Sequence, residues 1–261
     1  MRSGIRPTLR KLQTYRTMHI TTLHPDLRKN LRNLVQGYVE HCEFSEYLTG
    51  RIDFPLYYLG FKYGAPVFTH VGPGHEREDR PVVGLIGWNT PTSQLASQVL
   101  LQFIEILTQH PKVAGNAILR LLPVANPVAL ELDEDAPSHE EWDLLGHLAG
   151  QFRNQATHGL IEIEAGDVKE FTLRGEIPPV VYQALETVSV IIPAIRGRIA
   201  VPTSINVTPV ESDERWQLRL TVPSGWSDPR SVHAVARFLV RLLHTQTRLT
   251  RHARKLARPF P

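Results

Sequence analysis

The chain has 261 residues, of which 42% are hydrophobic, and this is enough to bury one sizeable core. The net charge is only +3, and the single cysteine, Cys42, rules out an internal disulfide, so nothing in the composition indicates an oxidising compartment. No window approaches the roughly 18 apolar residues of a membrane span, and the basic N-terminus lacks an apolar signal core. We therefore expect a soluble, cytoplasmic protein with no membrane partner.

Positive charge gathers near the two ends of the chain. The residues are Arg2, Arg6, Arg10, Lys11 and Arg16, and Arg248, Arg251, Arg254, Lys255 and Arg258. Such ends can contact nucleic acid, anionic lipid or an acidic partner, but they lack the interleaved aromatic residues that stack on bases. We interpret them as solvated ends. The predicted organisation is an N-terminal helical extension at 1–50, an α/β domain at 51–247 and a basic C-terminal tail at 248–261.

In the first half of the chain, helical spacing of apolar residues before position 50 is followed by extended segments. Strands are predicted at 54–61, 66–71 and 81–87, and the last of these is a short apolar run typical of buried parallel strands. A helix follows, with Thr90 as its N-cap and Pro91 at its first position.

The second half continues this alternation. The predicted elements are a strand at 117–124, a helix opened by Ser138, a strand at 159–164, a helix at 179–187, a strand at 188–192, extended runs at 205–207 and 217–222, and a last helix capped by Asp228. Such alternation predicts an α/β fold with a mixed, largely parallel sheet and helices on both faces.

In a sheet of this kind, ligands bind outside the carboxyl ends of the strands. The predicted crevice therefore brings together Gly87–Asn89, Asn126 and Glu164–Asp167. Glu162 and Glu164 alternate with isoleucines, so both carboxylates face one side of their strand. We expect Glu162 to meet an arginine or a helix N-terminus, and Glu164 to point into the crevice.

Three segments at these strand ends carry a family resemblance. They read R-P-V-V-G-L-I-G-W-N at 80–89, P-V-A-N-P at 123–127 and I-E-I-E at 161–164. Their order and spacing resemble the G-[IV]-H-G-x-E, P-v-x-N-P and I-D-L-H segments of the zinc carboxypeptidases, most closely the succinylglutamate desuccinylase and aspartoacylase branch. The resemblance extends from about Gly50 to Leu243. It implies a phosphorylase/hydrolase-like α/β fold and, in the family, a zinc-dependent hydrolase.

This chain departs from the family pattern at each position that the resemblance assigns to a zinc ligand. Ile86 and Glu164 stand where the family has histidines, and Asn89 stands where it has a glutamate. Catalytic zinc takes three nitrogen, oxygen or sulfur ligands, so we predict no zinc here. The Asn-Arg pair that holds the substrate carboxylate in the family has no counterpart at 127–159. The family's general-base glutamate on a late strand has none in either alignment of that strand, at 202–207 or at 218–225.

These departures lead to three hypotheses. The favoured one is a catalytically inactive protein with no catalytic residue and no cofactor, which binds a small molecule, a peptide or a protein partner. Its remnant cleft is formed by Trp88, Asn89, Asn126 and Glu164. On this hypothesis we expect no nucleic-acid partner.

The second hypothesis is an active peptidase or N-acyl amino acid amidohydrolase with a relocated zinc site. Its ligands would come from His70, His75, His158 or the Glu162–Glu164 strand. The third is a module that binds nucleic acid or another anionic surface through the basic ends of the chain.

Overall fold

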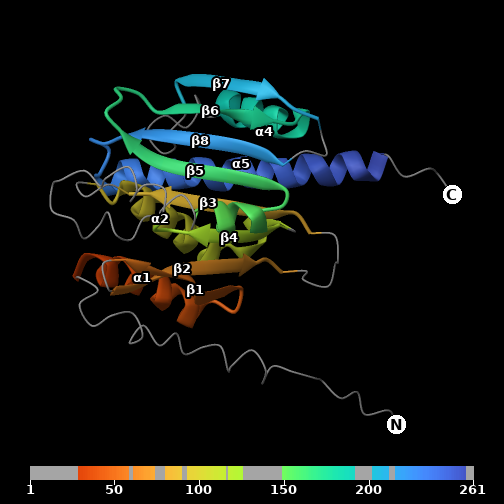
Figure 1. Cartoon of the computed structure of the whole chain (residues 1–261). Helices are drawn as coiled ribbons and strands as arrows, with labels where there is room; N and C mark the ends of the chain where they lie inside the picture. The colour runs from red at the N-terminus through yellow and green to blue at the C-terminus, as the bar shows by residue number, and fades with distance from the viewer. Residues whose placement is uncertain are drawn as a thin grey trace, which may run out of the picture.

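A single eight-stranded mixed sheet forms the centre of the protein (Figure 1). The computed structural model describes residues 29–58, 61–73, 80–89, 93–115, 117–125, 149–191, 202–211 and 215–256. The strands are β1 (Leu48–Tyr58), β2 (Phe61–Val71), β3 (Val82–Trp88), β4 (Ile118–Leu122), β5 (Gly159–Gly166), β6 (Thr172–Ile177), β7 (Ser204–Pro209) and β8 (Trp216–Pro223). Their order across the sheet is β1-β2-β4-β3-β5-β8-β6-β7.

The middle of the sheet is parallel and its margins are mixed. Neighbours in the row β4-β3-β5-β8 all pair in parallel, whereas β1 pairs antiparallel with β2, β2 with β4, and β6 with β8. β3 is apolar on both faces, as a strand buried between helical layers requires, whereas β5 carries Glu162 and Glu164 on one face. The predicted mixed, largely parallel sheet is therefore confirmed.

Helices lie on both faces of the sheet, as predicted. The described helices are α1 (Lys29–Phe44), α2 (Leu95–Gln109), the short 3₁₀ helix η3 (Pro111–Ala114), α4 (Pro179–Ile191) and α5 (Pro229–Leu256). The main apolar core joins the four α-helices to one face (Figure 1). The helical residues 149–155 lie on the opposite face, where Phe152 packs in a second cluster with Ile86 and Leu160.

The strand predicted at 188–192 is wrong, because α4 continues to Ile191. The β-branched run in this segment favours a strand when it is taken alone. In the folded chain, Val181, Ala184, Leu185 and Val188 are all buried at helical spacing against the main core. Tertiary packing therefore overrides the local preference.

Two boundaries and one further strand differ from the sequence prediction. The segment 54–61 spans the end of one strand and the start of the next, and these pair as the β1–β2 hairpin. α2 begins at Leu95 and not at Pro91, because residue 93 forms a β-bridge. The strand β6 was not predicted. The helix expected from Ser138 and the N-cap residue Thr90 lie outside the described residues.

Both ends of the described chain are tied to the central domain. Tyr38 of α1 is fully buried and stacks on Phe68 with 4.8 Å between ring centroids, so the extension predicted at 1–50 contributes to the core.

The predicted N-cap of the last helix is confirmed, because Asp228 accepts bonds from the backbone N–H groups of Arg230 and Ser231. α5 then continues through residues 248–256, which the sequence analysis assigned to a tail. No described helix is both long and apolar enough to cross a membrane.

Candidate functional site

The strand ends that carry the resemblance meet at one edge of the sheet. β3, β4, β5 and β8 are parallel, so their carboxyl ends lie together. Trp88 is the register partner of Glu164, and the Ala125 N–H donates to the Gly87 carbonyl at 3.0 Å. The structure thus brings Gly87–Asn89 and Glu164 side by side, as the sequence predicted. Asn126 lies outside the described residues.

Trp88 lies on the same sheet face as the two glutamates of β5. Strand register places Trp88 opposite Glu164, and Ile86 opposite Glu162. The Trp88 ring is half-buried, and the Arg153 guanidinium carbon lies 5.9 Å from the ring centroid. The indole and the guanidinium are within the range of a cation–π interaction.

The position assigned to the first zinc ligand is part of the apolar core. Ile86 is fully buried and packs with Val67, Leu122 and Phe152. Its register partner is Glu162, so Ile86 lies two residues before Trp88 along β3, away from the carboxyl ends of the strands. Ile86 therefore offers neither a donor atom nor access to the strand-end edge.

Asn89, the second assigned position, is a structural side chain in this conformation. It is only 2% exposed. Its Nδ2 donates to Ser97 Oγ at 2.6 Å and to the Pro123 carbonyl at 3.1 Å, and its Oδ1 accepts from the Ser97 N–H at 3.2 Å. The amide thus serves a free N–H in the first turn of α2 and ties that turn to β3 and the end of β4. A ligand in the crevice would not reach it.

Replacing Asn89 by alanine is expected to lower the free energy of unfolding by about 2 kcal/mol, because it leaves the buried Ser97 N–H without its acceptor. Urea unfolding followed by circular dichroism measures this change. Asn206 is an exposed asparagine on β7, and its alanine variant serves as the control. An equal, small effect in both variants would show that the Asn89 bonds do not hold the β3–α2 junction.

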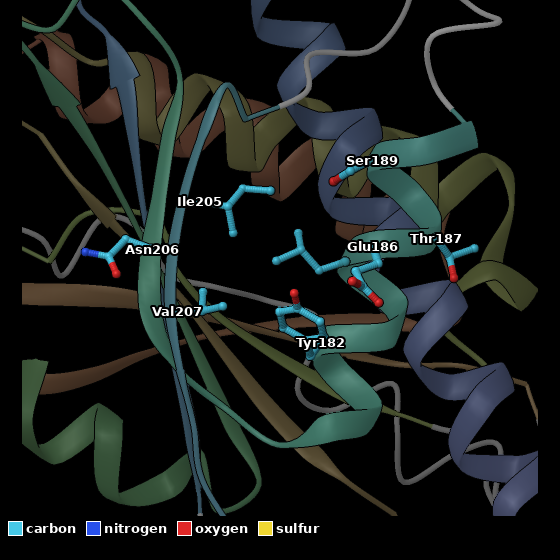
Figure 2. Close-up of a pocket in the computed structure, with 8 residues that line it drawn as sticks. Tyr182, Glu186, Thr187, Ser189, Ile205, Asn206 and Val207 are labelled. Atoms are coloured by element: carbon cyan, nitrogen blue, oxygen red, sulfur yellow. The ribbon is translucent and has the colours of Figure 1, made fainter.

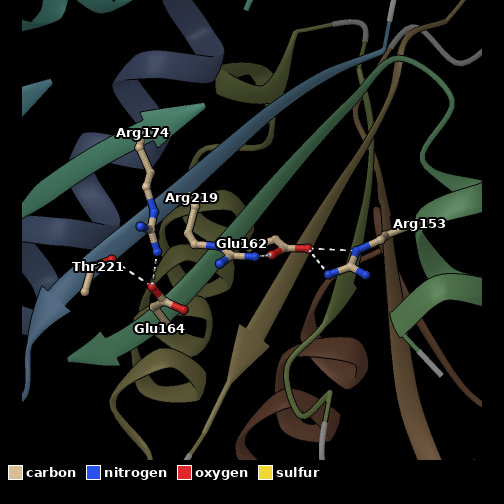
Figure 3. A network of polar contacts seen from close by, with 6 residues as sticks. All are labelled: Arg153, Glu162, Glu164, Arg174, Arg219 and Thr221. Carbon is tan, nitrogen blue, oxygen red and sulfur yellow. Dashed lines mark hydrogen bonds and ion pairs between the residues drawn. The ribbon is translucent and has the colours of Figure 1, made fainter. Parts of the chain in front are cut away.

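A network of carboxylates and guanidinium groups covers the sheet face beside Trp88 (Figure 3). Glu162 is 5% exposed and lies between two arginines. The Arg153 Nε donates to Glu162 Oε1 at 2.8 Å, and the Arg219 Nη2 donates to Glu162 Oε2 at 2.9 Å. The expectation that Glu162 meets an arginine is confirmed.

Glu164 is less buried and more weakly held than Glu162. The Thr221 hydroxyl donates to its Oε1 at 2.8 Å, and the exposed Arg174 guanidinium lies 3.5 Å from the same oxygen (Figure 3). Thr221 is the register partner of Glu164 on β8. Its hydroxyl group therefore stands beside Glu164 at the strand-end edge, and β8 itself contains no Asp or Glu.

The sequence analysis missed the partners of these glutamates. Arg219 and Thr221 alternate with the buried Leu218 and Leu220, the same two-residue pattern that marks Glu162 and Glu164. That pattern shows that the two residues share a face. Only the β5–β8 pairing shows that this face meets the glutamates.

The histidines proposed for a relocated metal site do not converge in the described structure. His70 is buried on β2, and His158 precedes β5, at the opposite end of that strand from Glu164. His158 Nδ1 accepts a bond from the Val82 N–H at 3.1 Å. His75 lies outside the described residues, and within them no three His, Cys, Asp or Glu side chains are placed to hold a metal ion.

His70 makes the stability of the fold depend on pH. Its side chain is 1% exposed, and neither ring nitrogen has a hydrogen-bond partner in the described part of the chain. Burial lowers the pKa of His70 from 6.5 to about 4. Between these values the unfolded chain binds a proton that the folded chain does not, so stability is lost as the pH falls through this window.

We expect the free energy of unfolding to fall by about 2 kcal/mol between pH 7 and pH 5 because of this residue alone. In a His70→Leu variant that part of the fall should disappear, and a His110→Gln variant, which replaces an exposed histidine, serves as the control. Urea unfolding at a series of pH values measures both. An unchanged pH dependence in His70→Leu would contradict the assignment.

A separate hollow lies on the helical side of the sheet, at the edge formed by β7 (Figure 2). It has a volume of about 800 Å³ between α4 and β7. Tyr182 and Ile205 are exposed apolar residues at its wall, and Glu186 is its charged residue. No sequence motif marked this hollow, and none of the predicted cleft residues lines it.

The residues at the strand-end edge do not fit zinc. Ile86 has no donor atom, and the Asn89 amide is already engaged by Ser97 and Pro123. Glu164 is a single oxygen ligand with a guanidinium beside it. A catalytic zinc site needs three such ligands, so this donor set is insufficient.

Comparisons with known proteins agree with this architecture. No protein-family model and no curated protein sequence matches the chain. A metallo-carboxypeptidase from Burkholderia cenocepacia is similar in structure, with a TM-score of 0.56 and 12% identity over 85% of this chain and 69% of that one. A Pseudomonas aeruginosa metallo-carboxypeptidase, solved in complex with (2-guanidinoethylmercapto)succinic acid, has a TM-score of 0.52 and 13% sequence identity. The match covers 86% of this chain and 69% of that one. An aspartoacylase family protein from Mesorhizobium loti has a TM-score of 0.44 and 13% sequence identity, over 75% of this chain and 66% of that one. The two metallo-carboxypeptidases, with TM-scores of 0.56 and 0.52, show the fold alone, and the predicted carboxypeptidase-like fold is confirmed.

Proposed function

We propose that this chain is a catalytically inactive protein with a carboxypeptidase-like fold, which uses the strand-end edge for binding. One observation carries the proposal: the carboxylates at this edge are engaged by arginines and a hydroxyl group. Glu162 is held by Arg153 and Arg219, and Glu164 by Arg174 and Thr221 (Figure 3). A general base must be within reach of the proton that it removes, and a metal ligand must present a free lone pair.

The charges at this edge favour an anionic ligand. Three arginines face two glutamates, which leaves one positive charge in excess among the described groups. Arg174 and Arg219 are also the most exposed members of the network, at 61% and 43% of their side-chain surface. Guanidinium groups bind carboxylates and phosphates through paired N–H donors. We therefore propose a small molecule or a peptide that carries a carboxylate or phosphate group.

Trp88 would form an apolar wall of the same cleft. Its ring is half-buried between the apolar cluster around Ile86 and the Arg153 guanidinium. Small-molecule sites combine such apolar surfaces with a few polar groups that fix orientation. Of the predicted cleft residues, Trp88 and Glu164 can contact a ligand in this conformation. Asn89 supports the cleft from beneath.

The metal content of the purified protein tests the inactive state. After incubation with zinc and removal of excess metal, we expect less than about one tenth of an equivalent by elemental analysis, because a structural or catalytic zinc needs three or four ligands. Near one equivalent would contradict the proposal and would favour the hydrolase hypothesis with a relocated site. Single alanine variants of His70, His75 and Glu164 would then show which residues bind the metal.

A further inference from the structure

The outer face of α5 carries a row of arginines. The helix runs for 28 residues and contains six arginines, one lysine and three histidines, but no Asp or Glu. Its other side supplies much of the main core, through Val235, Phe238, Leu239 and Leu242. The exposed Arg241 and Arg248 lie on the side that faces away from the core.

Helical geometry places three of the arginines along one line. Arg237, Arg241 and Arg248 are four and seven residues apart, and at 3.6 residues per turn they fall within roughly 40° of one another. Arg241 and Arg248 are exposed, and Arg237 is half-buried. Arg251, Arg254 and Lys255 follow in the same helix. From Arg237 to Lys255 the helix rises about 27 Å.

The acidic groups on the elements around α5 are engaged elsewhere. Glu105 of α2 accepts bonds from Gln102 and Gln109 of its own helix. Glu186 of α4 lies at the hollow beside β7 (Figure 2), and Asp228 caps the first turn of α5. Within the described part of the chain, no ion pair joins Arg237, Arg241 or Arg248 to a carboxylate.

Two histidines of this helix, His233 and His244, are turned toward its neighbours. The ring of His233 contacts Gln102 of α2 at 3.1 Å, and the ring of His244 contacts the Val113 carbonyl of η3 at 3.1 Å. They help to fix α5 against α2 and η3, and the arginines remain as the groups that define the outer face.

We propose that this face of α5 binds the phosphate backbone of a nucleic acid. A row of guanidinium groups on a rigid helix matches a linear array of phosphates, which Arg contacts through charge-assisted hydrogen bonds. No aromatic residue lies on the row, so contacts with the backbone and not with the bases are expected.

Other polyanionic partners fit this surface less well. A helix that lies in a membrane inserts its apolar face among the lipids, but the apolar face of α5 is buried in the core. Protein interfaces are centred on apolar and aromatic residues, and the row has none. The sequence analysis expected no nucleic-acid partner because the basic ends lack interleaved aromatic residues and were interpreted as solvated. The continuation of α5 to Leu256 gives these charges a fixed helical frame.

The test is fluorescence anisotropy with a labelled DNA duplex of mixed sequence, measured over a series of salt concentrations. The intact chain should bind with an affinity that falls steeply as salt is added. An Arg241→Gln/Arg248→Gln variant should bind at least about 10-fold more weakly near 0.1 M salt, with a salt slope smaller by about 2, because each phosphate contact contributes about 0.9 to the slope.

A Lys169→Gln variant is the control, set beside Arg248→Gln alone so that each variant loses one exposed cation. Lys169 lies between β5 and β6 and is not a member of the strand-end network. The control should bind within about 2-fold of the unmodified chain, and Arg248→Gln should bind more weakly than the control. Equal losses in these two single variants would overturn the proposal. Absence of duplex binding with retained binding to phosphatidylserine vesicles would identify a lipid partner and would also overturn it. This test is independent of the zinc measurement and of the cleft.

Discussion

A Gly175→Ala variant is expected to lose about 4 kcal/mol of unfolding free energy, from overpacking and backbone strain together, or to fail to fold. A Cβ atom at this position would lie 2.0 Å from the Gln217 carbonyl oxygen and 3.0 Å from the Leu218 Cα. These are backbone atoms of β8, which pairs with β6 at this point, so no side-chain rotation relieves the contact. The φ of Gly175 is also positive, at 157°.

The Gly150→Ala variant provides the matched control for this prediction. Among the residues that the structure describes, nothing lies within 4 Å of a Cβ added to Gly150, and the residue lies in the helical segment 149–155. Alanine is favoured over glycine in helices, so this variant should gain up to about 1 kcal/mol. Urea unfolding monitored by circular dichroism compares the two. A loss below about 1 kcal/mol for Gly175→Ala would mean that β6 can move away from β8 at little cost.

The missed strand β6 shows where sequence patterns become uninformative. Its sequence, T-L-R-G-E-I, places Arg174 and Glu176 on one face and interrupts the strand with a glycine. A short strand with one exposed face and a central glycine gives a weak local signal. Its position is fixed by β8, which lies more than forty residues later in the chain. The strand β3 was predictable because both of its faces are apolar, and β5 because buried isoleucines alternate with its two glutamates.

The same limit applies to the candidate site. The alternation in β5 was enough to predict that Glu162 and Glu164 share a face. The strand-end rule was enough to bring them to the edge that carries Trp88. The sequence could not identify their partners, because Arg153 comes from a helical segment and Arg219 from a strand 57 residues away. Nor could it show that the assigned ligand position Ile86 pairs with Glu162 and not with Glu164.

The strand-end network also explains how two carboxylates at this edge are compatible with a stable fold. A carboxylate buried on a sheet face is costly unless a cation compensates it. Arg153 and Arg219 supply that compensation at Glu162, and Thr221 with Arg174 supplies it at Glu164 (Figure 3). The same arginines that stabilise the carboxylates leave the edge with an excess of positive charge. Stability and the proposed preference for an anionic ligand therefore arise from one set of residues.

Glu162 is expected to stabilise the fold through its two arginine partners. Replacing Glu162 by leucine is expected to lower the free energy of unfolding by about 3 kcal/mol, because two guanidinium groups lose their carboxylate on a largely buried face. This loss of free energy is at the low end of the range for buried ion pairs. The side chains of Arg153 and Arg219 are 31% and 43% exposed, so water solvates their guanidinium groups in part. The Glu164→Gln variant is the control on the same strand and should cost less than about 1 kcal/mol.

A double-mutant cycle separates the ion pair from simple packing. Arg153→Met alone should cost about 1 kcal/mol, because Glu162 keeps Arg219 as a partner. The Glu162→Leu/Arg153→Met double variant should be more stable than the sum of the two single changes predicts, by at least about 1 kcal/mol. In the double variant apolar side chains fill the space beside Trp88, and the unpaired Arg153 charge of the Glu162→Leu variant is gone. Additivity within about 0.5 kcal/mol would instead show that Glu162 acts through its packing, and that Arg219 alone balances its charge.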